Sequence, residues 1–205
     1  MLLCDIGNTS YHFLDDDSDY KEDVTAFDPS SIKEKVYYIS VNSSVEKKLE
    51  TLDNWINLKP HVDMGSYYET MGVDRIFACE AIENGVIVDA GSAITVDVVE
   101  DGVFEGGFIY PGVNAMAKTY ENISPALAYS FNFELDLGKM PKNSGDAISY
   151  GYLKTLYSEV ISKSKDIFLT GGDADKFAMI FPNAKIDKLL IFNGMKKIIK
   201  KAELC

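Results

Sequence analysis

A short turn of the form Asp-x-Gly-polar lies between two strand-like apolar runs at two places in this chain of 205 residues. The first copy, residues 5–10, follows an apolar run at 2–4. The second copy, residues 89–92, begins 84 residues later, between runs at 86–88 and 93–99. Glycine lets a backbone approach an anion closely, and consecutive N–H groups of a turn form an anion-binding concavity. The repeat therefore predicts a duplicated phosphate-binding device on two similar α/β lobes that face a shared cleft.

Periodicity and turn chemistry predict the other elements, and in each half hairpin strands come before strand–helix units. The expected strands cover residues 11–14, 35–41, 103–110, 167–170 and 189–192, with a bulge or close backbone approach at Gly106-Gly107. The expected helices cover residues 44–58 with Ser43 or Ser44 as N-cap, 72–82, 113–122, a long helix capped by Ser144, a helix after the turn at 171–174, and 193–202. This alternation divides the chain into an N-terminal lobe, residues 1–84, and a C-terminal lobe, residues 85–205.

Three other features are interpreted as structural. The acidic residues 15–19 fit a solvated turn better than a metal site, because they lack the glycine and the distal glutamate of a calcium loop. Trp55 fits a core or interface position better than a ligand platform. Neither His12 nor His61 has a serine or cysteine partner in a recognisable arrangement, so the sequence predicts no histidine-based triad.

The net charge of −12 excludes some classes of partner. Nucleic acids and anionic membranes require clustered Lys and Arg, whereas a small phosphate-bearing ligand needs only a few main-chain N–H groups and a cation. Cys4, Cys79 and Cys205 are scattered and odd in number, which is typical of a reducing compartment. The sequence has no apolar run of about 20 residues and no signal peptide, so it predicts a soluble cytoplasmic protein with neither a nucleic-acid nor a membrane partner.

Phosphate transfer explains why both turns combine an acid with neutral donors. Asn8, Thr9 and Ser10 in the first turn, and Ser92 in the second, can donate hydrogen bonds. The acid repels phosphate, so its presence makes chemical sense only if it holds a cation or a metal-bound water beside the phosphates. The Gly-Gly turn at 171–172 can admit a flat adenine ring. Together these turns predict an ATP-dependent phosphotransferase.

Asp74 and Arg75 admit two interpretations from their spacing. They follow Gly72 at the start of an expected helix, so Asp74 can cap that helix while Arg75 stays solvated. Alternatively, a carboxylate in this position removes the proton of an acceptor hydroxyl, and the planar fork of Arg75 binds a carboxylate. The spacing alone leaves both interpretations open.

Four motifs, at residues 5–9, 72–75, 89–97 and 106–112, together resemble the type III pantothenate kinases. These kinases belong to the superfamily of acetate and sugar kinases, hexokinase and actin. The resemblance implies two ribonuclease H-like lobes around a central cleft. It also implies ATP-dependent phosphorylation of pantothenate to 4'-phosphopantothenate, the first step of coenzyme A biosynthesis. A kinase for another small hydroxylated acid or sugar, and a non-catalytic regulatory paralogue, remain the alternatives.

The resemblance implies a role for each motif residue. Asp74 would be the general base, Asp5 would lie near Mg²⁺, and Asp89 would hold a monovalent cation, K⁺ or NH₄⁺. ATP would be bound by Asp5, Ile6, Gly7, Asn8, Thr9, Ser10, Gly91, Ser92, Gly171 and Gly172. Pantothenate would be bound by Gly72, Val73, Arg75, Tyr67, Gly107 and, from the other subunit of a homodimer, Ser144.

Two departures from the family pattern affect these contacts. Ser92 and Ser144 stand where the family usually has Thr, and both keep the hydroxyl. The family's Pro-containing approach to the Gly-x-Asp-Arg motif is absent, and residues 66–71 stand there instead. Tyr67 or Tyr68 in this segment either lines the substrate site or only packs.

Overall fold

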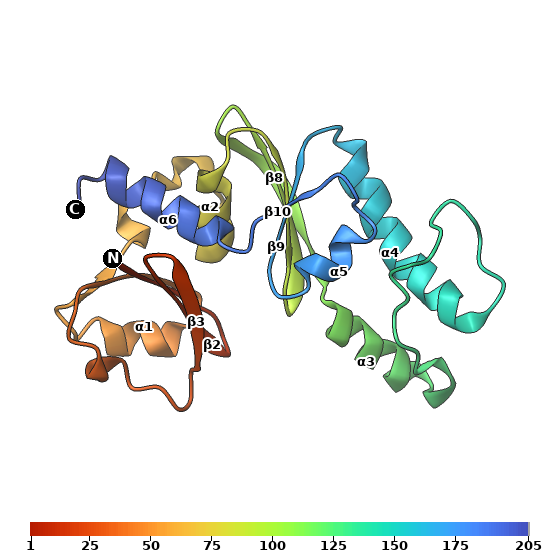
Figure 1. Ribbon diagram of the computed structural model, residues 1–205, viewed down its shortest axis with the longest axis horizontal. Coiled ribbons are helices and arrows are strands. Elements are labelled where there is room, and N and C mark those ends of the chain that lie inside the picture. Colours follow the sequence, from red (N-terminus) through yellow and green to blue (C-terminus); the bar gives the residue numbers. More distant parts are fainter. Residues whose placement is uncertain (205) are drawn as a thin grey trace. The chain divides into compact units, whose positions relative to one another are not determined.

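The computed structural model describes residues 1–204, which form two compact units. The first unit comprises residues 1–82 together with 189–204, and the second comprises residues 83–188. Each unit holds a five-stranded mixed sheet flanked by helices, which confirms the predicted α/β class with a duplicated sheet (Figure 1). The C-terminal residues differ from the expected division, because 189–204 belong to the first unit and not to a lobe of residues 85–205.

The sheet of the first unit has the strand order β3-β2-β1-β4-β5. These strands are β1 Leu2–Ile6, β2 Ser10–Asp15, β3 Ser18–Asp23, β4 Val36–Ser40 and β5 Trp55–Asn57. β1 is antiparallel to β2 and parallel to β4, so the predicted hairpin and the strand at 35–41 are confirmed. The acidic stretch 15–19 is a turn only at residues 16–17. From Ser18 onward the chain forms an exposed edge strand, where charged side chains remain in water.

Helix α1, Ser43–Leu49, is much shorter than the predicted helix 44–58. Residues 55–57 instead pair in parallel with β4. The helix predicted beyond Leu49 from the spacing of apolar residues is therefore wrong, because pairing with β4 makes residues 55–57 a strand.

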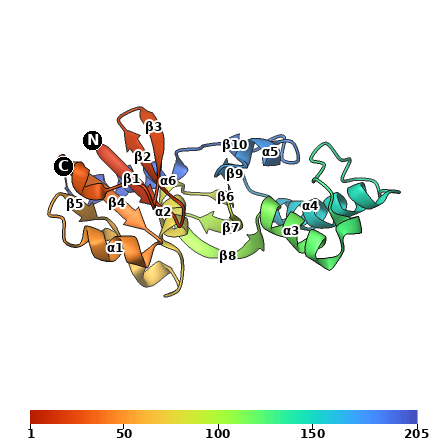
Figure 2. The same ribbon diagram turned by 90° about the horizontal axis from the view of Figure 1, so that it is seen from below.

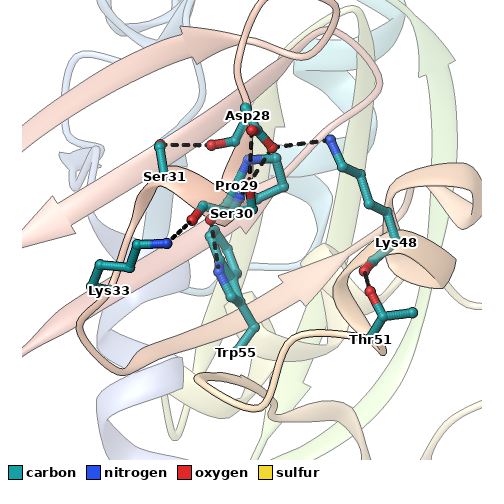
Figure 3. A network of polar contacts seen from close by, with 8 residues as sticks. All are labelled: Asp28, Pro29, Ser30, Ser31, Lys33, Lys48, Thr51 and Trp55. Carbon is teal, nitrogen blue, oxygen red and sulfur yellow. Dashed lines mark hydrogen bonds and ion pairs between the residues drawn. The ribbon is translucent and has the colours of Figure 1, made fainter.

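Trp55 is buried in the core of the first unit, as the sequence predicts. Its indole Nε1 donates a hydrogen bond to the carbonyl oxygen of Pro29 at 3.3 Å (Figure 3). Asp28 accepts hydrogen bonds from Ser30 and, at 3.3 Å, from Lys48 on α1. This network ties the segment before β4 to both the helix and the last strand of the sheet.

Two asparagines cap helices for which the sequence predicted serine caps. The side chain of Asn42 accepts hydrogen bonds from two N–H groups in the first turn of α1, at 3.2 and 3.3 Å. Asn143 accepts one from the N–H of Asp146 at 2.9 Å, at the start of α4, Ser144–Ser162. The predicted caps, Ser43 or Ser44 and Ser144, are wrong, because an asparagine one residue before each helix already bonds these donors.

Helices α2, Val73–Ala81, and α6, Leu190–Lys201, lie side by side in the first unit (Figures 1 and 2). Gly194 permits this contact, because a Cβ there would lie 1.9 Å from the carbonyl oxygen of Phe77. The predicted strand at 189–192 is wrong, because α6 begins at Leu190 and buries Leu190 and Phe192 in the first unit without a sheet edge.

The sheet of the second unit has the strand order β10-β9-β6-β7-β8. The strands are β6 Gly85–Ala90, β7 Ala93–Glu100, β8 Val103–Pro111, β9 Ile167–Thr170 and β10 Lys185–Ile186. The predicted meander and the strand at 167–170 are confirmed, and β10 is an addition. The predicted bulge is also present: the register shifts between Val98 and Val99, and Gly106 has a φ of 135°.

Three helices pack against one face of this sheet in a common core. They are α3 Val113–Ile123, α4 Ser144–Ser162 and α5 Ala174–Ala178. The core side of β6 and β7 carries Val86, Val88, Ile94 and Val96. Because side chains alternate along a strand, the intervening residues of β6 and β7 belong to the opposite face.

Across residues 1–204, no helix combines the length and apolarity that crossing a bilayer requires.

Candidate active site

The first turn joins β1 to β2 and is held by the main chain. The N–H of Gly7 donates a hydrogen bond to the carbonyl oxygen of Ser10 at 3.0 Å. Asn8 and Thr9 are exposed at the tip, and Asp5 lies half-buried on β1 just before the turn. The turn thus offers exposed neutral donors next to a carboxylate.

Gly72 makes room for the carboxylate of Asp74 at the start of α2. Oδ1 of Asp74 accepts a hydrogen bond from the N–H of Arg75 at 2.8 Å. A Cβ on Gly72 would lie 2.5 Å from that oxygen, so a larger residue would turn the carboxylate away. The glycine of the Gly-x-Asp-Arg motif therefore permits the orientation in which the acid bonds to the N–H of Arg75.

Burial raises the pKa of the Asp74 carboxyl above its ordinary value. The hydrogen bond from the N–H of Arg75 and the positive charge of Arg75 oppose this shift and do not cancel it. A carboxylate with a raised pKa takes up a proton more readily, which is the property that a general base needs.

Arg75 is buried, with 5% of its surface exposed, and Tyr68 contacts it in two ways. Nη1 of Arg75 donates a hydrogen bond to the Tyr68 hydroxyl, and its guanidinium carbon lies 5.7 Å from the centre of the Tyr68 ring. The hydroxyl of Tyr67 instead donates to Oε1 of Glu80 at 3.0 Å. Tyr68 therefore helps to orient the Arg75 fork, a contact that the sequence did not single out from its neighbour.

The second turn, the Gly-Gly turn and the start of α3 come together in the second unit. A Cβ on Gly171 would lie 2.3 Å from Oδ1 of Asp89, and its φ is 85°. A Cβ on Gly112 would lie 2.2 Å from the carbonyl oxygen of Ser92. The N–H of Asp173 donates to the carbonyl oxygen of Ala90 at 2.9 Å. Two segments distant in sequence thus pack against the second turn, and only glycine fits at both contacts.

A hollow of about 520 Å³ in the same unit lies between α3, the loop at 129–134 and α5. Val113 and Asn114 at the start of α3 line one side, and Lys176 of α5 and Met179 line another. This volume falls in the range of small-molecule sites. Because α5 follows the Gly-Gly turn directly, the hollow adjoins the segment that the sequence assigned to the nucleotide.

The predicted site residues differ in exposure. Ile6 and Val73 are buried in the first unit, so only their main-chain groups can meet a ligand. Gly107 is exposed on β8, opposite Asp97 of β7. Ser144 is exposed at the start of α4. Further along the same helix, about 12 Å away, the hydroxyl of Tyr152 donates a hydrogen bond to the carbonyl oxygen of Pro111 at the end of β8.

The carboxylates assigned to cations, Asp5 and Asp89, do not belong to a larger ligand cluster in the described part of the chain. Within residues 1–204, no group of three or more His, Cys, Asp and Glu side chains is arranged to hold a metal ion. A single carboxylate nevertheless fits Mg²⁺ in a kinase, because Mg²⁺ keeps several waters and binds substrate phosphates. The close fit of Gly171 against Asp89 leaves this second carboxylate half-buried among main-chain atoms, which suits a weakly hydrated cation.

Comparisons with known proteins point to one family. The sequence profile described as type III pantothenate kinase matches residues 20–163. A type III pantothenate kinase of Sulfurimonas denitrificans is 67% identical over 205 residues, and the alignment covers 100% of both chains.

Solved structures give the same picture of the fold. A crystal structure of a Campylobacter jejuni protein, described as a conserved Baf family transcriptional activator, is 42% identical over 100% of both chains, with a TM-score of 0.90. Component A of (R)-2-hydroxyglutaryl-CoA dehydratase from Acidaminococcus fermentans matches at a TM-score of 0.51 and 15% identity, over 99% of this chain and 98% of its own. This second likeness shows the fold alone. The ordered motifs, the matching profile and the full-length relative together show that the chain belongs to the type III pantothenate kinase family.

Proposed function

We propose that the chain is a pantothenate kinase, which transfers the γ-phosphoryl group of ATP to pantothenate and forms 4'-phosphopantothenate, the first step of coenzyme A biosynthesis. Family membership supports this reaction. The observation that carries it is the half-buried Asp74 carboxylate, with its raised pKa, directly beside the buried Arg75. This pair supplies a proton acceptor and a carboxylate-binding group at adjacent positions.

Asp74 accepts the proton of the primary hydroxyl of pantothenate as that oxygen attacks the phosphoryl group. Positioning and neutralisation of charge supply most of the catalysis in phosphoryl transfer, so one well-placed carboxylate is sufficient. Arg75, held by Tyr68, binds the pantothenate carboxylate through its planar fork. Gly72, Val73, Tyr67 and Gly107 complete the contacts with this substrate.

ATP binds through both turns and the Gly-Gly segment. The phosphates accept hydrogen bonds from the first turn, Gly7–Ser10, and from Gly91 and Ser92. The adenosine part lies by Gly171 and Gly172 and extends into the hollow between α3 and α5. Mg²⁺, held through Asp5, and K⁺ or NH₄⁺, held through Asp89, neutralise phosphate charge when they are bound.

A coupled assay of ADP formation tests the proposal. ADP is expected to form from ATP and Mg²⁺ only when pantothenate is present, and faster with K⁺ or NH₄⁺ than with Na⁺ as the monovalent cation. Turnover of another hydroxylated acid or a sugar, with pantothenate inactive, would instead make the chain a different kinase. Nucleotide binding without turnover of any acceptor would favour a regulatory paralogue, the role that the description of the Campylobacter jejuni structure suggests for that protein.

The proposal extends to a homodimer in which Ser144 of one subunit contacts the pantothenate of the other. The exposure of Ser144 at the start of α4 supports this. Sedimentation of the active protein is expected to give the mass of a dimer. Asp74→Asn and Ser144→Phe subunits, each inactive alone, are expected to recover activity when mixed, because one site of the mixed dimer then holds both native residues. Active monomers, or no recovery in mixed dimers, would remove the shared site.

We also propose that the protein works in the cytoplasm. Neither Cys4 nor Cys79 forms a disulfide, and both are buried. Burial raises the pKa of the Cys4 thiol well above its ordinary value, which keeps it in the unreactive form. Buried cysteines that form no disulfide are typical of proteins in a reducing compartment.

A further inference from the structure

The hydroxyl of Thr95 is a buried polar atom with no hydrogen-bond partner in the structure. It stands out because every other buried side-chain nitrogen or oxygen of a non-exposed residue within residues 1–204 has a partner. Leaving such an atom unpaired costs about 1–3 kcal/mol, so the Thr95 hydroxyl is free to pair with a bound ion or a water that the protein itself does not supply.

The strand register places Thr95 next to Asp89. Asp89 of β6 pairs with Thr95 of β7 on one side and with Thr170 of β9 on the other. Residues directly opposite each other in neighbouring strands share one face and have Cβ atoms about 4.5–5.5 Å apart. A carboxylate is therefore flanked by two hydroxyl-bearing side chains in one row across the sheet.

This row has the chemistry of a cation site. An anion placed there would meet the charge of Asp89, whereas carboxylate and hydroxyl oxygens are the ligands that hard cations prefer. Gly171 borders the site on one side, since a Cβ there would lie 2.3 Å from Oδ1 of Asp89. Thr95 is half-buried, and its oxygen is out of contact with bulk water, so a bound ion there would be largely shielded from solvent.

We propose that the Thr95 hydroxyl oxygen is a direct ligand of the monovalent cation that Asp89 holds. This assignment rests on the proposed function, in which that cation supports ATP binding. It adds an uncharged oxygen ligand from β7 to the carboxylate from β6, so the cation bridges two neighbouring strands.

Binding measurements test this ligand without relying on turnover. The affinity for a non-hydrolysable ATP analogue is measured by calorimetry across a K⁺ titration, and Tl⁺ binding is followed by thallium NMR. The variants are Thr95→Val, which removes the hydroxyl at nearly constant shape, and Thr95→Ser, which keeps it. Thr51→Val is the matched control, because Thr51 is an exposed residue of the first unit whose hydroxyl bonds only to the carbonyl oxygen of Lys48. Thermal melting verifies that each variant is folded.

In Thr95→Val, the K⁺ concentration that half-saturates the effect on nucleotide affinity is expected to rise by about tenfold or more, with a matching loss of Tl⁺ binding. Thr95→Ser and Thr51→Val are expected to respond like the wild type. Equal weakening of analogue binding with and without K⁺ would overturn the proposal in favour of a hydroxyl that contacts phosphate. A Thr95→Val response identical to the wild type would overturn it in favour of packing alone. Nucleotide binding by the wild type that ignores K⁺ would instead count against the cation in the proposed function.

Discussion

Replacing Asp74 with Asn is expected to lower kcat for pantothenate-dependent ADP formation by about 10²–10⁴-fold while the protein stays folded. The amide has nearly the shape of the carboxylate and can still accept the hydrogen bond from the N–H of Arg75. It cannot accept the proton of the attacking hydroxyl. Steady-state kinetics with saturating ATP measure the loss, and calorimetry is expected to show that pantothenate and the ATP analogue still bind.

Asp53→Asn is the matched control, because Asp53 is an exposed carboxylate of the same unit. It is expected to leave kcat unchanged. An Asp74→Asn variant with full activity would overturn the assignment of the base, and a loss of substrate binding without a change in kcat would show that Asp74 only positions pantothenate.

The pH dependence of the wild type and of Asp74→Asn tests independently whether the pKa of the Asp74 carboxyl is raised. Because the pKa of Asp74 is raised above its ordinary 3.8, wild-type kcat/KM is expected to fall on the acid side with an inflection above that value. The folded state holds the proton more tightly than the unfolded state does. The stabilisation from neutral Asp74 is therefore complete below pH 3.8 and is lost as the pH rises through the folded-state pKa. Thermal melting of Asp74→Asn is accordingly expected to lie above the wild type near neutral pH, and this gain should shrink on acidification.

Gly171→Ala is expected to destabilise the protein by about 2–4 kcal/mol and to abolish binding of the ATP analogue. The residue has a φ of 85°, which disfavours any side chain. Its Cβ would lie 2.3 Å from Oδ1 of Asp89 and 2.7 Å from the main chain of Ala90. The β6 strand and the Gly-Gly turn would have to separate, which moves the carboxylate out of the site. Denaturant unfolding and calorimetry measure the two effects.

Gly172→Ala is the stability control for this variant. Nothing lies within 4 Å of a Cβ at Gly172, so its free energy of unfolding is expected to change by less than about 0.5 kcal/mol. If Gly171→Ala melted like Gly172→Ala, the close contact between the Gly-Gly turn and Asp89 would not exist in solution.

The differences between the predicted and observed elements have a common cause. Helix 44–58 was expected from apolar spacing, but residues 55–57 pair with β4 and Trp55 bonds to Pro29. The strand at 189–192 was expected from an apolar run, but these residues begin α6, in which Phe192 packs on His12 and Gly194 lies against the main chain of α2. In both places a contact with a distant segment outweighed the local pattern. The hairpins, by contrast, depend on short-range turn chemistry between neighbouring strands.

The two Asp-x-Gly-polar turns were determined by the sequence alone, because such a turn between apolar runs needs only its own residues to form. The sequence alone also determines that Asp74 and Arg75 are neighbours, because they are consecutive residues. Only the tertiary structure decided that Tyr68 orients Arg75 and that Gly171 closes on Asp89. It also decided that Thr95 lies beside Asp89, because the pairing of β6 with β7 sets which side chains share a face, and a shift of one residue would turn the hydroxyl to the other side.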